Sequence, residues 1–181
     1  MVAQKIKISY KTTEIQKSNY IFAPTNIVGT IMNIEQSIKN SIPLSPAART
    51  TVNILYTSRF IEEKSAPLYK KHGITSAHFN ILRILRGQKG NPANLSTIQE
   101  RMIDRGSNTT RLIDKLITKN WVTRRQCPTN RRKIEVNITE VGLEILLEID
   151  REVEPTLNNI LSNLTEQEMG QLNTLLDKVR V

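Results

Sequence analysis

The chain has 181 residues, which fits one domain, and 38% of them are hydrophobic, which is enough for a core only if helices pack efficiently or share an interface. Its 26 Lys and Arg outnumber its 17 Asp and Glu, giving a formal net charge of +9. One cysteine excludes an internal disulfide, and the sequence has no run of about 18 apolar residues that would predict a transmembrane helix. Because the N-terminus also lacks the apolar core of a secretory signal, we expect a cytoplasmic protein with no membrane partner.

Residues 1–44 show no sustained helical or strand period, and their apolar residues are scattered. Such a pattern is typical of a poorly ordered N-terminal extension. Two alternatives remain open for this segment. It could be a basic arm that contacts DNA, or translation could begin at Met32.

Two helices are predicted before residue 90. Ser45 is a cap followed by Pro46 at the first helical position, so a helix should run from there to about Lys71, before Gly73 stops it. Its apolar residues lie on more than one side. A second helix over residues 76–86 is apolar enough to be largely buried.

A helix-turn-helix follows. A short helix over residues 94–102 and a turn containing Gly106 precede an amphipathic helix, for which Ser107 is the expected N-cap and Asn120 the left-handed end. At 100° per residue, this helix has an apolar face that also includes Thr109. The apolar face consists of Leu112, Ile113, Leu116 and Ile117, and the polar face of Arg111, Asp114, Lys115 and Thr118.

A two-stranded ribbon comes next. Alternation through Ile134, Val136 and Ile138 predicts a half-buried strand, residues 122–127 are its partner, and residues 128–132 form the turn. Helix-strand-strand units occur in many folds, but the charge distribution is informative. Residues 75–140 hold 13 Lys and Arg against 5 Asp and Glu, a net charge of +8, whereas residues 141–181 carry −5. A winged helix-turn-helix with this charge indicates binding to DNA phosphates.

Residues 140–181 predict two more helices. One should run from Glu140 to about Asn163 with a bend at Pro155, and a capping box at residues 165–168 should open the other. These helices have more apolar surface than one small domain easily covers. A two-fold dimer would bury it, and an intramolecular bundle in a monomer is the alternative.

The segment TTRLIDKLITKNWVTRR, followed by NRRKIEVNITEVG, resembles the multiple antibiotic resistance regulator (MarR) family of winged helix-turn-helix transcription regulators. Members share a T-R-L-x-D-x-L recognition helix and a D-R-R wing that leads into L-T-x-x-G. The resemblance covers about residues 45–181. Asn120 stands in place of the family's glycine and can adopt the same conformation. Asn130 stands in place of the wing aspartate and cannot supply an anionic partner for a wing arginine.

The resemblance implies a mostly α fold with a small β-wing, in which a winged helix-turn-helix at about residues 75–140 is flanked by dimerisation helices at about residues 45–72 and 140–181. It implies a homodimeric, sequence-specific DNA-binding regulator that represses from a pseudo-palindromic operator. Base edges should be reached from the start of the recognition helix, by Ser107, Asn108, Thr110 and Arg111, with Lys115 at phosphate. The wing residues Asn130, Arg131 and Arg132 should lie at the flanking minor groove.

Members of this family also bind small, often aromatic ligands between the dimerisation helices and the winged unit. Candidates to line such a pocket here are Tyr56, Phe60, His78 and Arg83, although aromatic residues at helical spacing usually pack in a core. Two histidines and one cysteine form no cluster with metal-ligand spacing, and no phosphate-binding glycine pattern occurs. We therefore expect no enzymatic activity, cofactor or metal. The alternative to an operator-binding regulator is a winged helix that serves only protein interaction or dimerisation.

Overall fold

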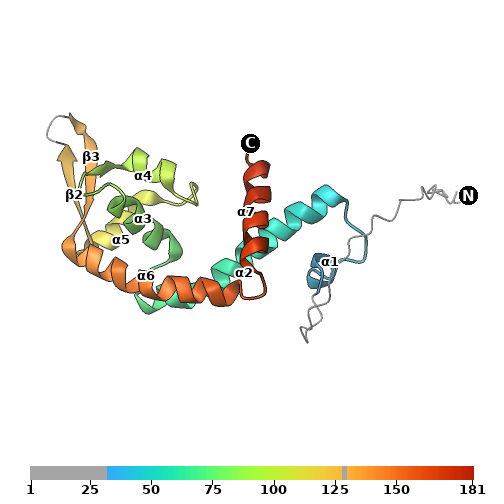
Figure 1. Ribbon diagram of the computed structural model, residues 1–181. Helices are drawn as coiled ribbons and strands as arrows, with labels where there is room; N and C mark the ends of the chain where they lie inside the picture. The colour runs from blue at the N-terminus through green and yellow to red at the C-terminus, as the bar shows by residue number, and fades with distance from the viewer. Residues whose placement is uncertain (1–31, 128–129) are drawn as a thin grey trace, which may run out of the picture. The chain divides into compact units, whose positions relative to one another are not determined.

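The computed structural model describes residues 32–127 and 130–181, with side chains at residues 32–127 and 133–181 (Figure 1). It consists of two units, residues 1–41 and 42–181. In the first unit, the described part contains one short helix, α1 (Ile34–Ser37), which the sequence analysis did not anticipate. A reciprocal cap between Asn33 and Gln36 begins it. The second unit contains the remaining helices and the sheet.

The first two helices of the second unit match their predicted bounds. Helix α2 (Pro46–Lys71) begins at Ser45, whose hydroxyl accepts from the backbone N–H of Ala48 at 3.3 Å. It ends beside Gly73, whose φ of +68° is left-handed. Helix α3 (Ser76–Arg86) buries six of its residues, because it packs against four other helices and against β3.

The helix-turn-helix consists of α4 (Leu95–Arg101) and α5 (Thr109–Thr118). The prediction that Ser107 caps α5 was wrong. Asn108 is the cap, and its side-chain oxygen accepts from the N–H of Arg111 at 3.1 Å. Ser107 instead donates its hydroxyl hydrogen to the carboxylate of Asp104 at 2.6 Å. This hydrogen bond to the turn replaces the cap that the hydroxyl was expected to form with the backbone of α5.

A three-stranded antiparallel sheet has the order β1-β3-β2. Strands β2 (Val122–Cys127) and β3 (Asn130–Ile138) form the predicted ribbon, but β3 begins within the segment that was assigned to the turn, so that assignment was too long. Strand β1 (Ala93–Asn94) was not predicted. Its two residues pair with Val136 and Glu135, which places the start of α4 against the sheet.

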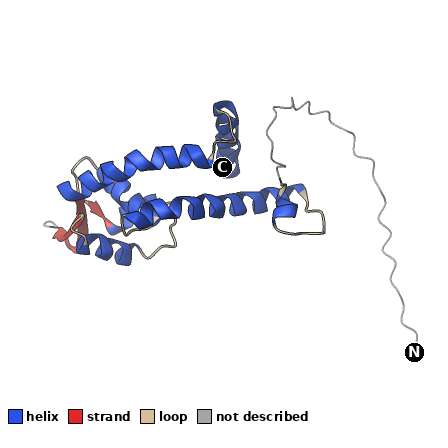
Figure 2. Ribbon diagram, turned by 90° about the horizontal axis from the view of Figure 1, so that it is seen from below, coloured by secondary structure: helices blue, strands red, loops and turns tan. Residues whose placement is uncertain are grey.

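Helices α6 (Glu140–Ile160) and α7 (Glu166–Val179) complete the unit. Helix α6 packs against α2 and α3, and α7 turns away from it after a short loop (Figures 1 and 2). Thr165 and Glu168 form the predicted capping box of α7. No residue of α7 is buried within the described chain, although its sequence is amphipathic. Among the described helices, none has the length and apolar character that crossing a bilayer requires.

The core lies between α3, the helix-turn-helix, the sheet and the first half of α6. Its completely buried side chains come from all of these elements, so the recognition helix and the wing share one hydrophobic core with the scaffold. They include Ile81, Leu82, Ile98, Ile113, Leu116, Val136, Leu146 and Ile149, each with 0% of its surface exposed. Truncation of such a side chain to alanine typically costs about 2–5 kcal/mol.

Candidate DNA-binding surface

Helix α5 presents one polar face to solvent because its other face is anchored in the core. Ile113 and Leu116 are fully buried and Thr109 is 7% exposed, so Thr109 packs as predicted. Thr110, Arg111 and Lys115 are exposed on the opposite side. Their side chains form no hydrogen bond or ion pair with any residue in the described part of the chain. This face therefore offers two cations and a hydroxyl to a ligand.

The turn before α5 is held by Asp104. Its carboxylate accepts from the N–H of Gly106 at 2.9 Å and from the hydroxyl of Ser107 at 2.6 Å. The hydrogen bond from Ser107 is the main reason that the pKa of Asp104 lies below its usual value. Ser107 and Asn108, both predicted to reach bases, thus already have structural roles in the turn, whereas Arg111 and Lys115 do not.

One ion pair connects the ribbon to the recognition helix, and a second connects the two strands of the ribbon. Arg124 on β2 donates to Asp114 on α5 at 2.7 Å, and Arg125 donates to Glu135 across the strands at 2.9 Å. A hydrogen bond with Cys127 is the main cause, and Arg125 the next, of the lowered pKa of Glu135. Neither ion pair was predicted from the sequence, because residues ten positions apart meet only once the strand register and the packing of α5 against β2 are known.

The tip of the wing lies partly outside the described residues. The backbone of β3 begins at Asn130, opposite Cys127. The side chains of Asn130, Arg131 and Arg132 are outside the described part of the structure. Their predicted contacts with the minor groove or with phosphate remain predictions.

A close joint connects the end of α5, the start of β2 and the start of α6. The hydroxyl of Thr139 donates to the carbonyl of Asn120 at 2.8 Å and accepts from the N–H of Gly142 at 3.0 Å, which caps α6. The N–H of Thr139 donates to the carbonyl of Trp121 at 3.0 Å. Asn120 has φ +59°, the left-handed conformation that was predicted for it. Thr139 and Gly142 thus hold the exit of the wing against the end of the recognition helix.

Comparison with known proteins agrees with a winged helix-turn-helix that has an exposed polar recognition helix. The MarR family model matches residues 74–134. The multiple antibiotic resistance protein MarR of Escherichia coli (strain K12) is 32% identical over 123 residues, which are 67% of this chain and 81% of that protein. The chain belongs to the MarR family. The transcriptional regulator MhqR of Bacillus subtilis (strain 168) is 28% identical over 145 residues, covering 80% of this chain and 92% of that protein.

Solved structures of MarR proteins have the same fold. A mutant MarR from E. coli, complexed with operator DNA, aligns with 82% of this chain and 99% of its own at a TM-score of 0.64 and 24% identity. BpsR of Bordetella bronchiseptica, whose DNA binding is regulated by 6-hydroxynicotinic acid, aligns with 77% of this chain and 98% of its own at a TM-score of 0.67 and 19% identity. Proteins of the MarR family are DNA-binding transcription regulators.

The four candidates for a MarR-type ligand pocket have different surroundings in the described chain. Tyr56 and Phe60 lie one turn apart on α2 and are 48% and 42% exposed. His78 is buried in the first turn of α3, and the guanidinium of Arg83 lies over the ring of Phe79. A different cavity, of about 610 Å³, lies between α2, the start of α3 and the turn before α5. Its lining includes Ser65, Asn80, Asp104, Ser107 and Leu112, none of which was predicted from the sequence to line a ligand pocket.

His78 has a structural role at the start of α3. Its Nδ1 accepts from the N–H of Thr75 at 3.2 Å and lies 2.7 Å from the hydroxyl of Thr75, so the ring proton is assigned to Nε2. Nε2 is buried with no hydrogen-bond partner among the described residues. Burial, and next the positive charges of Lys115 and Lys119, lower the pKa of His78 to about 4.

His78→Gln should reduce the change in the free energy of unfolding with pH below pH 6.5. Between pH 6.5 and 4 the unfolded chain binds a proton at His78 that the folded chain does not, so the free energy of unfolding should fall as the pH is lowered through this range. Glutamine can replace the ring at the third position of a capping box but does not titrate. Urea unfolding of both proteins at several pH values measures this difference. An unchanged slope for the variant would show that His78 does not cause it.

Proposed function

We propose that this chain is a sequence-specific regulator that binds duplex DNA as a homodimer and represses transcription from a pseudo-palindromic operator. The observation that carries the proposal is the free polar face of α5, where Thr110, Arg111 and Lys115 are exposed while Ile113 and Leu116 anchor the helix in the core. A helix of this kind, held rigidly on a basic winged unit, fits the major groove. The MarR–operator structure, which has the same fold, supports this reading.

Within this surface, the side chains differ in what they can recognise. The guanidinium of Arg111 lies in the first turn of α5 and can donate two hydrogen bonds to one guanine. Lys115, one turn further along, is a point charge suited to phosphate. We assign Ser107, Asn108 and Thr110 to the same groove, and Asn130, Arg131 and Arg132 to the flanking minor groove and its phosphates.

Exposed apolar side chains on the long helices support the homodimer. Leu55 on α2 and Leu175 and Val179 on α7 are each at least 60% exposed. A cavity of about 420 Å³ between α2 and α7 is lined almost entirely by apolar groups, among them Ile54, Leu172 and Leu176. A second copy would cover these surfaces and present two recognition helices about 34–36 Å apart, in successive major grooves.

We also propose that a small aromatic effector relieves repression. The cavity of about 610 Å³ is a better location for it than the four residues suggested by sequence, because its wall includes Asp104 and Ser107. These two residues hold the turn from which α5 begins. An effector that binds there and favours a DNA-incompetent arrangement would weaken operator binding by the same factor by which DNA weakens effector binding. BpsR, regulated by 6-hydroxynicotinic acid, is a precedent within the same fold.

Selection of bound fragments from genomic DNA, followed by binding assays with the selected site, tests the function. We expect Arg111→Ala to cost about 1–3 kcal/mol on the selected site and to relax preference at particular bases. Lys115→Ala should weaken all sequences similarly and reduce the salt dependence. Equal, sequence-independent losses for both variants would contradict base reading by Arg111. Failure to enrich any sequence would favour a winged helix that serves only protein interaction.

A further inference from the structure

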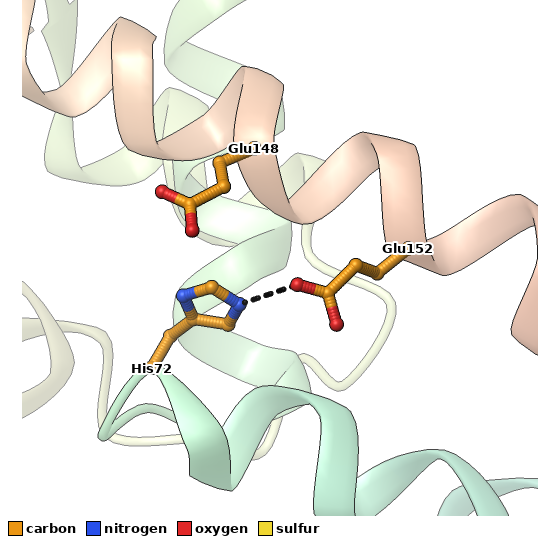
Figure 3. Close-up of side chains that lie close together, drawn as sticks. All are labelled: His72, Glu148 and Glu152. Atoms are coloured by element: carbon orange, nitrogen blue, oxygen red, sulfur yellow. Dashed lines mark ion pairs between the residues drawn. The ribbon is translucent and has the colours of Figure 1, made fainter.

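Three potential metal ligands meet where α2 ends against the middle of α6. His72 is the C-cap of α2, and Glu148 and Glu152 lie one turn apart on the facing side of α6 (Figure 3). One potential ligand atom from each residue lies within 4.8 Å of the others. Figure 3 shows both carboxylates extending from α6 toward the imidazole ring. None of these residues belongs to the DNA-binding surface.

The imidazole of His72 is the unusual member of this cluster. Its side chain is only 6% exposed, whereas that of Glu152 is 34% exposed and Glu148 is exposed. Nε2 is buried and forms no hydrogen bond of normal geometry with the described residues. It lies 3.5 Å from Oε1 of Glu152, a separation that allows an ion pair only when the ring is protonated. A buried nitrogen without a hydrogen bond of normal geometry, directed at the carboxylate of Glu152 and with that of Glu148 close to the same ring, is an available ligand.

We propose that His72, Glu148 and Glu152 bind a divalent transition-metal ion, with Zn²⁺ as the ion that fits best. Zinc bonds to imidazole nitrogen and carboxylate oxygen of about 2.0–2.2 Å place tetrahedral ligands about 3.3–3.6 Å apart. The distance of 3.5 Å between His72 Nε2 and Glu152 Oε1 already falls in that range. A rotation of the exposed Glu148 side chain supplies the third ligand, and water completes the site. An imidazole with two carboxylates favours zinc over Mg²⁺ or Ca²⁺, which prefer oxygen ligands alone.

Lys71 is a competitor for this site. Its ammonium donates to the same Oε1 of Glu152 at 2.8 Å, so it occupies one of the oxygens that zinc requires. The Lys71 side chain is 62% exposed and can move into solvent when a dication takes its place. Zinc would then replace a single exposed ion pair by a three-point connection between α2 and α6. Helix α6 begins directly after the wing, so the bound ion would brace the helix that supports the winged unit.

Calorimetric titration of Zn²⁺ into the metal-free full chain tests the proposal. The wild type should bind one ion per chain. Glu148→Gln should weaken binding at least tenfold, because loss of a residue that only supports a ligand already costs about tenfold, and Glu148 is itself a ligand. Glu148 is exposed, so this variant should fold. Glu154→Gln is the matched control, because it removes the same charge from the same helix but from another side, and it should bind as the wild type does. Equal weakening by both variants, or no stoichiometric binding, would overturn the site.

Two further measurements separate a metal site from a cluster of surface charges. Lys71→Ala should bind Zn²⁺ more tightly than the wild type, because the competing ammonium is gone, and unchanged or weaker binding would contradict the assignment of Glu152. Co²⁺ bound in place of Zn²⁺ should give the intense visible absorption of a four-coordinate ion, and this absorption should be lost in Glu148→Gln. The weak spectrum of hexahydrated Co²⁺ in the wild type would also contradict the proposal.

Discussion

Gly142→Ala should lower the free energy of unfolding by about 3 kcal/mol, the upper part of the range for overpacking a filled space. A Cβ at this position would overlap the carbonyl oxygen of Trp121 and lie 2.9 Å from Cγ1 of Ile138. The contact with Trp121 is to backbone, which cannot move aside as a flexible side chain does. The start of α6 would have to separate from the end of α5, which breaks the hydrogen bonds that Thr139 makes there.

Gly170→Ala is the matched control. Gly170 also lies within a helix, and a Cβ there would meet nothing within 4 Å in the described chain. The same substitution should therefore stabilise α7, by about 0.5–1 kcal/mol, since glycine in a helix is costly. Chemical unfolding of both variants beside the wild type gives the two values. If Gly142→Ala did not lower the free energy of unfolding, the packing between α5, β2 and α6 would not be as close as the structure indicates.

Removal of residues 164–181 should abolish dimerisation and leave a monomer or an aggregate. Helix α7 has no buried residue within the described chain, and its Leu172 and Leu176 line the apolar cavity beside α2. A monomer would engage only one half-site of an operator. Because linked binding sites gain about 10²–10⁴-fold in affinity over one site, operator binding should fall by a factor of that order. Sedimentation analysis and operator titration measure the two effects.

Deletion of residues 2–31 serves as the control for this truncation. These residues precede the part of the chain, about residues 45–181, that carries the resemblance to the MarR family. Dimerisation and operator affinity should remain nearly intact. A large loss of affinity would instead support the basic arm considered from the sequence. A soluble dimer that lacks α7 and still binds its operator would show that the dimer interface lies elsewhere.

Features that depend on residues close in the chain could be read from the sequence. Ser45 with Pro46 begins α2, Thr165 with Glu168 begins α7, and Asn120 ends the recognition helix, all as predicted. Each is a contact between a side chain and backbone a few residues away, so its energy needs no knowledge of the fold. The apolar period of α5 likewise predicted which face is buried, because the core covers whichever face is apolar.

Local signals failed where two nearby groups competed or where the partner was distant in sequence. Ser107 and Asn108 are both good caps, and the choice between them depended on Asp104 accepting the serine hydroxyl. Strand β1 has only two residues, too few to show a strand pattern in the sequence. It is a strand only because it pairs with β3. The pocket suggested around Tyr56 stays a prediction, because helical periodicity alone does not say which faces converge on an empty space.

The sequence by itself thus determined the helices from α2 onward, the ribbon, the concentration of positive charge and the family, since these follow from local propensity, periodicity and composition. Only the tertiary structure decided which groups meet across elements. It paired Asp114 with Arg124, closed Gly142 onto Trp121, and placed His72 beside two glutamates of α6 that lie far away in the chain. Such contacts depend on helix packing and strand register, and these are set by the common hydrophobic core that the distant segments form together.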